Sequence, residues 1–383
     1  MAHHLEQQPP ALIIDLAKGY GGAEVRVLDT AKSLHGRYPY TVATLTGSPL
    51  HQRLEAAGLS SLAVPLGRAD ARLLFFLLRA IRQAGYRVVD AHNVQSQFWG
   101  HLAARLAGVP AKVSTVHSAY QLEHNGSLKG RLYEQVLCFN AGWGVQFVAV
   151  SEAVQSYLQN IGIPSNSISL IHNSISLPDL PSLPESSLRE ALGWGKEMYV
   201  VIVVARLEPI KGHTFLIEAL SRIAAERPQL RCLIVGEGRE RATLEAQVQQ
   251  AQLQARVHFA GFRDDISALL SASDAFCLPS LSEGLPYALL EACAQSLPLL
   301  VTRVGGMAQL LNNQTALLVP PADPTALAEG LCWLMDHPQV ARWMGQMAFA
   351  TLQQHLSPDE MIYKTLEVYS HEFEKRPEGT LKF

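Results

Sequence analysis

Two basic side chains follow one of the most apolar segments of the sequence. Residues 198–204 form a continuous apolar run that predicts a β-strand, and Arg206 and Lys211 come directly after it. An arginine offers a fork of N–H donors and a lysine offers a compact positive charge, so the pair suits a diphosphate group. Two solvated surface cations are the alternative, and the spacing alone leaves both interpretations open.

A second polar segment follows residues 275–278, another predicted strand. Glu283 lies in the loop, Pro286 suits the first turn of the next helix, and Glu291 lies about one and a half turns inside it. Helix-start amides can bind a phosphate, Gly284 would let it approach the backbone, and carboxylates accept hydrogen bonds from sugar hydroxyls. The combination indicates a sugar nucleotide. Alternatively, Glu283 caps the helix and Glu291 is a surface residue, although its apolar neighbours argue against that.

Residues 19–24 form a Gly-rich turn after the first predicted strand, and its amides could meet a phosphate or a sugar. The spacing is not the G-x-G-x-x-G pattern of dinucleotide-binding folds. A second Gly-rich turn at residues 236–238 also fails that pattern, because Arg241 stands where the third glycine should be. The sequence therefore argues against an NAD site.

Two histidines lie at strand ends. His117 follows residues 111–116, and His92 follows residues 87–91. His117 could bind a sugar or assist an acceptor hydroxyl. A purely structural histidine is the alternative for both positions.

A basic amphipathic segment precedes the two histidines in the sequence. Arg68, Arg72, Arg79 and Arg82 would fall within an arc of roughly 80° on one helix, and the leucines and phenylalanines of residues 73–78 occupy much of the rest. Such a surface could contact anionic lipid. We favour the alternative, a helix packed on a sheet with an Arg-rich solvated face.

Short apolar runs alternate with helical patterns, which predicts α/β domains with parallel sheets. A Pro- and Ser-rich segment at residues 177–187 is the expected linker between two Rossmann-like domains at residues 1–176 and 188–357. The C-terminal segment, residues 358–383, contains a predicted helix long enough to return to the first domain. Because ligands bind beyond the carboxyl ends of parallel strands, we expect the site in a cleft between the domains. The expected strands are residues 11–16, 40–45, 87–91, 111–116, 147–150, 168–171, 198–204, 231–235, 257–259, 275–278 and 299–301.

The composition excludes some classes of protein. The 383 residues are 48% hydrophobic and 17% charged, which allows sizeable cores, and the net charge of −3 gives no nucleic-acid footprint. Dispersed cysteines without a C-x-x-C pattern indicate free thiols. The sequence has no signal-peptide pattern and no apolar run of the roughly 20 residues that a membrane span needs. We expect a cytoplasmic protein, with a peripheral position at the inner face of the membrane as an open alternative.

Together these segments resemble glycosyltransferase family 4, a family of retaining enzymes with the two-lobed GT-B fold, over nearly the whole chain. The most specific match is Glu283 and Glu291 in the family's E-x7-E pattern. Residues 205–212, ARLEPIKG, resemble the family's G-R-L-x-x-x-K-G loop. Weaker matches are GGAE at residues 21–24, STVHS around His117, VAVSEAV at residues 148–154, and VGEG followed by HFAGF at residues 258–262.

The resemblance implies a role for each matched residue. Arg206 and Lys211 would hold the donor diphosphate, Glu291 would bind the ribose, and Gly22 would close over the phosphates. His117 would lie by the transferred sugar. The remaining donor contacts would come from Glu283 with the backbone of Gly284, Leu285, Pro286 and Tyr287, and from Phe262 and Arg263 at the base. Arg206, Lys211, Glu283 and His117 are the expected catalytic residues.

The sequence departs from the family pattern at loop positions and leaves the expected phosphate and ribose ligands untouched. This chain has Asn173-Ser174-Ile175-Ser176 where the family often has N-G-[IV]-D, and it has Gln309 where the family usually has Glu. Ala205 and Ala316 stand where the family has Gly. The choice of donor is therefore open.

The resemblance implies a hexosyltransferase that uses a UDP- or GDP-sugar and a glycan or lipid-linked acceptor, with no cofactor and no metal ion. Arg206, Lys211 and the helix start near Tyr287 would stabilise the charge that grows on the leaving diphosphate. Two alternatives stay open. One is a nucleotide-sugar epimerase on the same fold, and the other is a non-catalytic sugar-nucleotide-binding protein.

Overall fold

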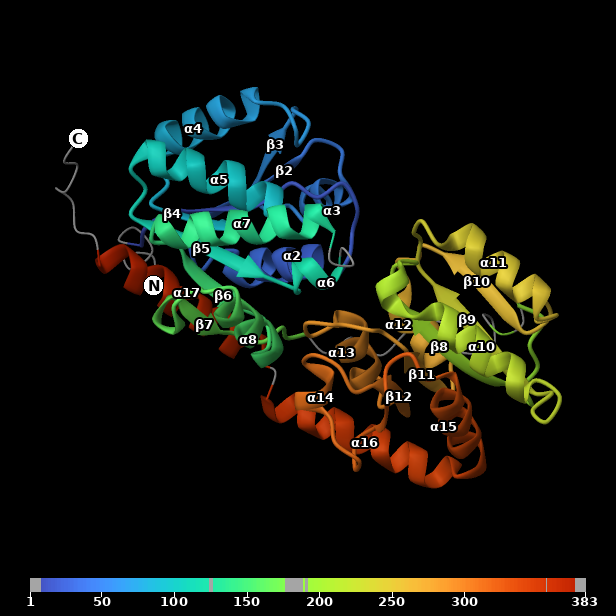
Figure 1. Cartoon of the computed structure of the whole chain (residues 1–383). Coiled ribbons are helices and arrows are strands. Elements are labelled where there is room, and N and C mark those ends of the chain that lie inside the picture. Colours follow the sequence, from blue (N-terminus) through green and yellow to red (C-terminus); the bar gives the residue numbers. More distant parts are fainter. Residues whose placement is uncertain (1–7, 124–126, 176–188, 190–191, 356, 376–383) are drawn as a thin grey trace. The chain divides into compact units, whose positions relative to one another are not determined.

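The computed structural model describes residues 8–123, 127–175, 189, 192–355 and 357–375 (Figure 1). These residues form two compact units. Unit 1 holds the chain up to Ser174 together with the C-terminal part from Pro358, and unit 2 runs from Ile175 to Ser357. The linker predicted at residues 177–187 lies outside the described residues.

Unit 1 is built on a seven-stranded parallel sheet with the order β3-β2-β1-β4-β5-β6-β7. The chain starts at the centre, moves outward to β3 and then returns to β4 on the other side of β1. Ligands of open α/β sheets bind at such a reversal of strand order. The strands are β1 Ala11–Asp15, β2 Tyr40–Leu45, β3 Ser61–Val64, β4 Val88–Ala91, β5 Ala111–Val116, β6 Gln146–Ala149 and β7 Ile168–Leu170.

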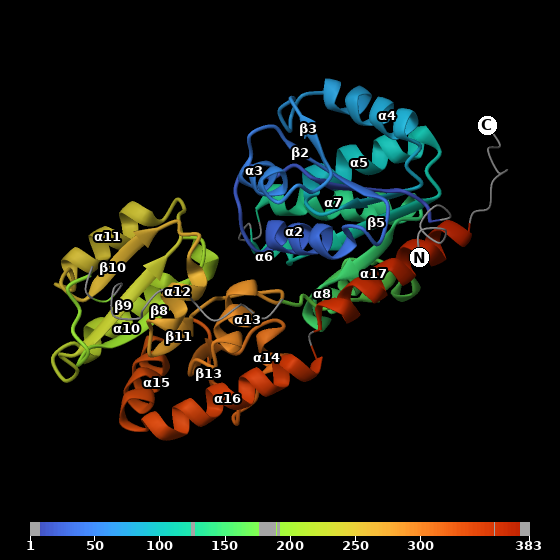
Figure 2. The ribbon, with the colours of Figure 1, turned by 180° about the vertical axis from the view of Figure 1, so that it is seen from behind.

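Helices cover both faces of this sheet (Figures 1 and 2). Ile13 of β1 packs in the cluster that includes α2, α3 and α17, whereas Leu12 and Ile14 pack with α4 and α5. Every residue of β1 is buried, as expected for a strand covered on both sides. The helices are α2 Gly22–Leu34, α3 Pro49–Ala56, α4 Arg72–Ala84, α5 Val94–Ala107, α6 Tyr120–Glu123, α7 Leu128–Gly142, α8 Glu152–Asn160 and α17 Pro358–Glu374, with a 3-10 turn η1 at Ser165–Ser167.

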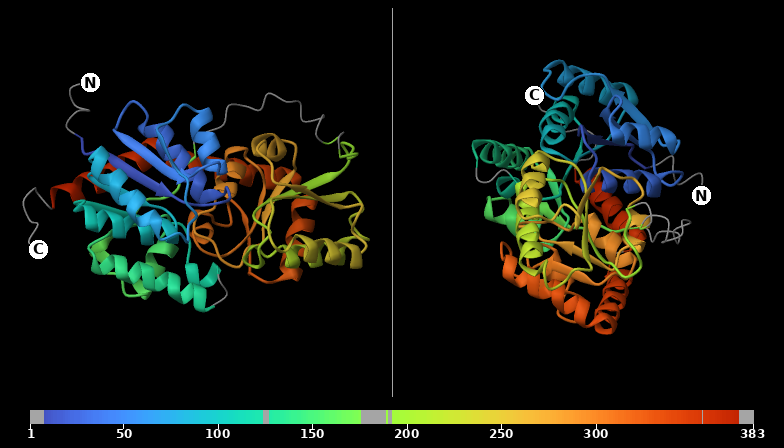
Figure 3. Two further views of the ribbon diagram at one scale, coloured as in Figure 1. Left: turned by 90° about the horizontal axis from the view of Figure 1, so that it is seen from above. Right: turned by 90° about the vertical axis from the view of Figure 1, so that its right-hand side faces the viewer.

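The C-terminal helix α17 is part of unit 1. Met361, Ile362 and Tyr369 are buried in the same cluster as α2, and the helix contacts both α2 and β5 (Figure 3). These apolar residues recur at the spacing of one helix face. The chain therefore returns to unit 1 after it has completed unit 2.

Unit 2 repeats the same strand order in a six-stranded parallel sheet, β10-β9-β8-β11-β12-β13. Its reversal lies between β8 and β11. The strands are β8 Tyr199–Val204, β9 Leu230–Val235, β10 Val257–Gly261, β11 Ala275–Leu278, β12 Leu299–Thr302 and β13 Leu317–Val319. The helices are α10 His213–Ile223, α11 Arg241–Gln250, α12 Ile266–Ser271, α13 Tyr287–Ala294, α14 Met307–Leu310, α15 Pro324–Asp336 and α16 Pro338–His355, with a 3-10 turn η2 at Pro209–Lys211.

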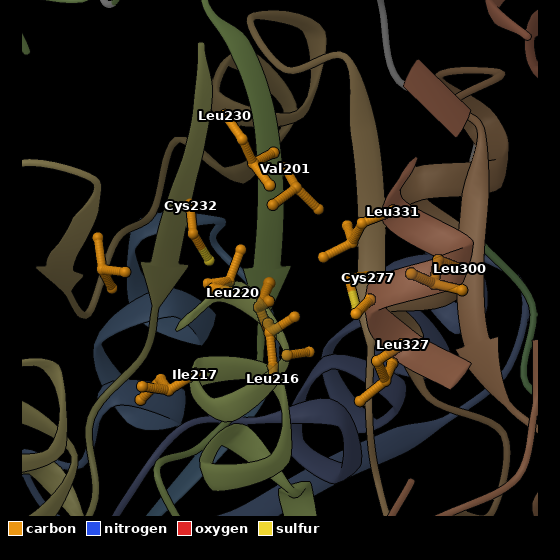
Figure 4. Close-up of a cluster of buried hydrophobic side chains, with 14 of the residues drawn as sticks. Val201, Leu216, Ile217, Leu220, Leu230, Cys232, Cys277, Leu300, Leu327 and Leu331 are labelled. Atoms are coloured by element: carbon orange, nitrogen blue, oxygen red, sulfur yellow. The ribbon is translucent and has the colours of Figure 1, made fainter. Parts of the chain in front are cut away.

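Figure 4 shows one of the two cores of unit 2. Val201, Cys232 and Cys277 come from three neighbouring strands and pack in one cluster with Leu216 of α10 and Leu327 of α15. The opposite face of the sheet packs against α12, α13 and α14. Both faces of the central strands are thus covered, so the loops at their carboxyl ends start from fixed points.

The predicted fold class, two Rossmann-like parallel-sheet domains, is confirmed. The predictions missed the edge strands β3 and β13. They also placed Arg68 on the basic helix, but α4 begins only at Arg72 because residues 67–70 form a turn and the Asp70 carboxylate accepts the Arg72 N–H at 2.9 Å. Helix α5 begins at Val94, since the Asn93 side chain caps it by accepting the Ser96 N–H at 3.0 Å.

The contact of α17 with unit 1 can be tested by a pair of adjacent substitutions. Ile362→Ala should lower the free energy of unfolding of unit 1 by about 2–5 kcal/mol, because it leaves a cavity in a packed core. Tyr363→Ala is the control: this side chain is 64% exposed, and its loss should cost less than about 0.5 kcal/mol. Hydrogen exchange of peptides from β1 and β5 in the full chain measures both values. Equal effects of the two substitutions would mean that α17 does not stabilise unit 1.

Candidate functional site

The loops after β8 and β11 flank the strand-order reversal of unit 2. Lys211 ends the short turn η2 after β8, and Glu283 lies in the loop after β11. The Lys211 Nζ atom lies 2.7 Å from Glu283 Oε1 and 2.8 Å from Glu283 Oε2. The two side chains are only 14% and 6% exposed. The fold thus pairs two predicted site residues that are 72 positions apart in the sequence.

Two further residues hold Glu283 in place, and the sequence does not mark them as site residues. The Ser280 hydroxyl donates to Glu283 Oε1 at 2.6 Å, and the Thr302 hydroxyl donates to the backbone oxygen of Ser280 at 2.6 Å. Both residues are fully buried. The signal in the sequence is weak, since it consists of one hydroxyl residue at the end of a buried strand and another just after one.

Backbone contacts join the same two loops. The Leu281 N–H donates to the Ile210 oxygen at 2.8 Å. Gly212 has a φ of 68°, and a Cβ at this position would collide with the backbone oxygen of Pro279. Only glycine tolerates both the left-handed backbone and the close approach. The position of Lys211 relative to Glu283 therefore depends on the glycine that follows Lys211.

The loop after β12 also contacts the backbone at Glu283. Gly305 has a φ of 54°, and a Cβ there would collide with the backbone oxygen of Glu283. The next residue, Gly306, donates its N–H to the Gly284 oxygen at 2.7 Å. Three loops from one sheet edge therefore fix the backbone around Glu283.

Helix α13 begins at Tyr287, so Pro286 is its N-cap and not a first-turn residue, as the sequence had suggested. Gly284 and Leu285 are buried before it, and Glu291 lies half-buried about one turn further along the helix. The first amides of a helix lack partners within it and form the positive end of its dipole. The start of α13 can therefore attract a phosphate.

Arg206, Phe262 and Arg263 are exposed residues in the loops after β8 and β10. Phe262 is 49% exposed, and Arg263 pairs with Asp265 at 2.6 Å. Because β8, β9 and β10 are parallel neighbours, these loops leave the same edge of the sheet as the Lys211–Glu283 pair. The structure places a guanidinium and an exposed aromatic ring along that edge.

In unit 1, the two predicted histidines contact each other. His92 and His117 follow the paired strands β4 and β5, and His92 Nδ1 lies 3.2 Å from His117 Nε2. Burial lowers the pKa of His117 well below its ordinary value, and the nearby His92 and Arg26 act in the same direction. His117 is therefore a neutral imidazole at physiological pH, with one N–H donor and one acceptor nitrogen.

Gly22 is the first residue of α2, in the segment after β1. Glu24 folds back over this helix start, because its Oε2 accepts the Gly21 N–H at 2.7 Å. A phosphate at Gly22 would face that carboxylate. Helix α13 has no acidic residue in its first turn, so it offers the more favourable environment for an anion.

The part of the chain that the structure describes contains no group of three or more His, Cys, Asp or Glu side chains that could hold a metal ion. The two parallel-sheet units have the same strand order. In unit 2, a cation, a carboxylate and a helix start lie where the strand order reverses. This arrangement is typical of nucleotide-binding proteins of the Rossmann type.

Two family models match the chain. The model described as Glycosyltransferase Family 4 matches residues 20–178, and the model described as Glycosyl transferases group 1 matches residues 185–350. This chain belongs to glycosyltransferase family 4.

The names of two similar proteins agree with this assignment. The chain is 32% identical over 252 residues to UDP-Gal:alpha-D-GlcNAc-diphosphoundecaprenol alpha-1,3-galactosyltransferase of Escherichia coli, covering 64% of this chain and 65% of that protein. It is 28% identical over 290 residues to a glycogen synthase of Mycobacterium tuberculosis, covering 74% of this chain and 68% of that protein. The match thus spans just under two thirds of the length of the Escherichia coli relative.

A crystal structure of Anabaena HepE in complex with UDP and glucose has the same fold. Its TM-score against this chain is 0.84 at 23% identity, and the alignment covers 95% of this chain and 100% of HepE. The GT-B fold class is thereby confirmed.

The dependence of the site on Gly212 can be tested against a matched glycine. Gly212→Ala should destabilise unit 2 by about 1–3 kcal/mol more than Gly193→Ala. Both glycines have left-handed backbones, with φ of 68° and 66°, but only a Cβ at Gly212 meets another backbone. Hydrogen exchange of the loop after β11 should become faster in Gly212→Ala alone. If both variants exchange alike, the contact between the two loops does not hold the site together.

Proposed function

We propose that this chain is a retaining glycosyltransferase that moves a hexose from a UDP- or GDP-sugar to a glycan or lipid-linked acceptor without a metal ion. The observation that carries the proposal is the Lys211–Glu283 ion pair at the strand-order reversal of unit 2. A nucleotide sugar presents a diphosphate and several hydroxyl groups, and this pair offers a partner for each.

In this proposal the diphosphate binds Lys211, Arg206 and the start of α13. Negative charge grows on the diphosphate as its bond to the sugar breaks, so preorganised positive groups stabilise the transition state more than the ground state. Lys211 is the better placed of the two cations for this task, because its side chain is only 14% exposed and is less screened by water. The backbone contacts would come from Gly284, Leu285, Pro286 and Tyr287.

Glu283 has two tasks in sequence. Before the donor binds, its carboxylate fixes the Lys211 ammonium at 2.7 Å, so the cation is already oriented. A diphosphate would compete with Glu283 for Lys211. The carboxylate keeps its hydrogen bond from Ser280 and gains an oxygen to accept from a hydroxyl of the transferred sugar.

We assign the remaining donor contacts as the resemblance to the family implies. Glu291 binds the ribose hydroxyls, while Phe262 and Arg263 lie beside the base. In unit 1, His117 hydrogen-bonds the sugar and Gly22 contacts the phosphates. Retention follows if the acceptor attacks from the face that the diphosphate leaves, with the leaving phosphate helping to deprotonate it.

The names of the relatives support this choice of substrates. The Escherichia coli relative is named for UDP-galactose as donor and for a diphosphoundecaprenol-linked acceptor. The Mycobacterium tuberculosis relative is named as a glycogen synthase, and HepE was crystallised with UDP and glucose. A uridine nucleotide is named for the Escherichia coli relative and for HepE, and a lipid-linked acceptor is named for the Escherichia coli relative.

We extend the proposal to peripheral contact of a cytoplasmic enzyme with an anionic membrane through α4 and the turn before it. Helix α4 buries Leu73, Leu77 and Ile81, but Phe75 is 69% exposed beside the exposed Arg79. Exposed aromatic and basic residues on one helix suit the boundary between lipid headgroups and acyl chains. The other basic residues of this surface are Arg68, Arg72 and Arg82. None of the described helices is long and apolar enough to span a bilayer.

The donor site can be tested by calorimetric titration of UDP and GDP. Arg206→Ala and Glu291→Ala should each weaken binding of the preferred nucleotide about 10- to 100-fold, because each removes a charged hydrogen-bonding group. Arg222→Ala and Glu218→Ala are the controls, since these residues form an exposed pair on α10 in the same unit. The controls should leave the affinity unchanged. If neither nucleotide binds, or if Arg206→Ala and Glu291→Ala bind like the parent, the donor site is wrong.

The same experiment continues with the matching nucleotide sugar and candidate acceptors. Transfer should persist in the presence of a chelator, and NMR of the product should show the anomeric configuration of the donor. An epimerised nucleotide sugar without acceptor would establish the epimerase alternative. Tight nucleotide binding without any turnover would establish a non-catalytic protein.

Membrane contact can be tested by sedimentation with vesicles rich in phosphatidylglycerol. Replacing Arg79 and Arg82 together with alanine should weaken binding about 30-fold, since each basic residue near an anionic surface contributes about 1 kcal/mol. Replacing Arg37 and Lys364 with alanine is the control, because it removes the same charge from α17 and the segment after α2, on the other helical layer of unit 1. Equal losses in the two double variants would argue for a bulk charge effect and against a contact through α4.

A further inference from the structure

A line of polar side chains runs through the interior of unit 1 and ends at His117. Tyr369 of α17 donates its hydroxyl to Asp90 Oδ2 at 2.7 Å, and Thr115 of β5 donates to Asp90 Oδ1 at 3.1 Å. Asp90 Oδ2 lies 3.4 Å from His92 Nε2, an ion-pair distance, and His92 Nδ1 lies 3.2 Å from His117 Nε2. Tyr369, Thr115, Asp90 and His92 are all at most 3% exposed.

Asp90 is ionised within this line. Burial by itself raises the pKa of a carboxyl group, but His92 and the hydroxyls of Tyr369 and Thr115 outweigh it and hold the pKa of Asp90 at about 2. An ionised carboxylate can only accept hydrogen bonds. His92 Nε2 faces this carboxylate at 3.4 Å and has no hydrogen-bond partner among the described residues, so a proton on this nitrogen is the arrangement that avoids two facing lone pairs.

The protonation of His92 sets that of His117. When Nε2 carries the single ring proton of His92, Nδ1 has a lone pair, and the hydrogen bond at 3.2 Å is then donated by His117 Nε2–H. The neutral His117 then presents a lone pair at Nδ1. This Nδ1 atom is buried and has no hydrogen-bond partner in the structure, so it can accept a hydroxyl from a bound molecule.

We propose that Asp90 and His92 are positioning residues that fix the tautomer of His117, and that Tyr369 of the C-terminal helix holds Asp90 in place for this purpose. The inference rests on the proposed function, because it assigns the lone pair of His117 to a hydroxyl of the sugar or of the acceptor. It also gives α17 a role in the site, because Tyr369 of this helix supplies the hydroxyl that binds Asp90.

Other charged groups approach the line without replacing Asp90. Asp15 at the end of β1 interacts electrostatically with His92, and its Oδ1 accepts from Asn93 at 2.8 Å. Arg26 of α2 acts on His117 and Tyr369, but its guanidinium is bound to the oxygens of Ile171, His172 and Asn173. Of these groups, only Asp90 lies at ion-pair distance from His92 Nε2.

The test is the tautomer of His117 in the full chain labelled with ¹⁵N-histidine. The ring signals are assigned by their loss in His117→Gln. The parent should show His117 protonated on Nε2 with a bare Nδ1. Asp90→Asn should shift His117 toward the Nδ1–H form, because an amide can donate to His92 Nε2 and so move the His92 proton to Nδ1. A parent already protonated on Nδ1, or ring signals unchanged by Asp90→Asn, would overturn the inference.

Kinetics separate the inference from the proposed function. Asp90→Asn should lower kcat about 10- to 100-fold while the affinity for UDP or GDP, measured by calorimetry, stays within about twofold. A shifted tautomer with unchanged kcat would overturn the positioning role. A parent without transferase activity would instead defeat the proposed function, and the ring signals would still decide the tautomer.

A milder variant covers the case in which Asp90→Asn does not fold. Tyr369→Phe removes one hydrogen bond to Asp90, and it should lower kcat and partly shift the His117 signals. Tyr38→Phe is the matched control: the Tyr38 ring lies 6.1 Å from that of Tyr369, and its hydroxyl donates to the Pro9 oxygen. This control should change neither quantity. Identical behaviour of the two variants would overturn the role of Tyr369.

Discussion

A parallel β-sheet is stable in water only when helices cover both of its faces, and this requirement governs both units. Covered strands leave their carboxyl ends at one edge. The first strand of each unit lies between its second and fourth strands, so β1 lies between β2 and β4, and β8 lies between β9 and β11. The loops after β8 and β11 therefore lie side by side although many residues separate them. The Lys211–Glu283 contact, the glycines that let the loops approach and the start of α13 all depend on that arrangement.

The buried polar groups of unit 1 obey a second constraint, that groups removed from water need partners. Asp90 meets it with hydroxyls from β5 and from α17, and with His92 on its own strand end. An ionised carboxylate at this depth costs free energy unless such partners surround it. The C-terminal helix thus contributes more than apolar burial, because its Tyr369 hydroxyl completes the coordination of a buried charge.

The sequence predicted some elements to the residue and missed others for a physical reason. β2, β5 and β11 have the predicted bounds, since a proline lies directly beside each of them, Pro39, Pro110 and Pro279, and marks one strand end. β3 and β13 are edge strands of four and three residues, and several of their residues are only half-buried, so their apolar pattern is short and incomplete. The predicted arc of four arginines included Arg68, because helical spacing alone does not show the turn at residues 67–70, in which Asp70 accepts the Arg72 N–H.

The sequence by itself determined the fold class and the family, because strand periodicity and the E-x7-E spacing are local patterns. It also determined which residue types follow each strand. Only the tertiary structure decided which of them meet: Lys211 with Glu283, His92 with His117, and Tyr369 with Asp90 across 279 positions. Periodicity reports the face on which a residue lies, whereas strand order and the return of α17 come from long-range packing that no local pattern encodes.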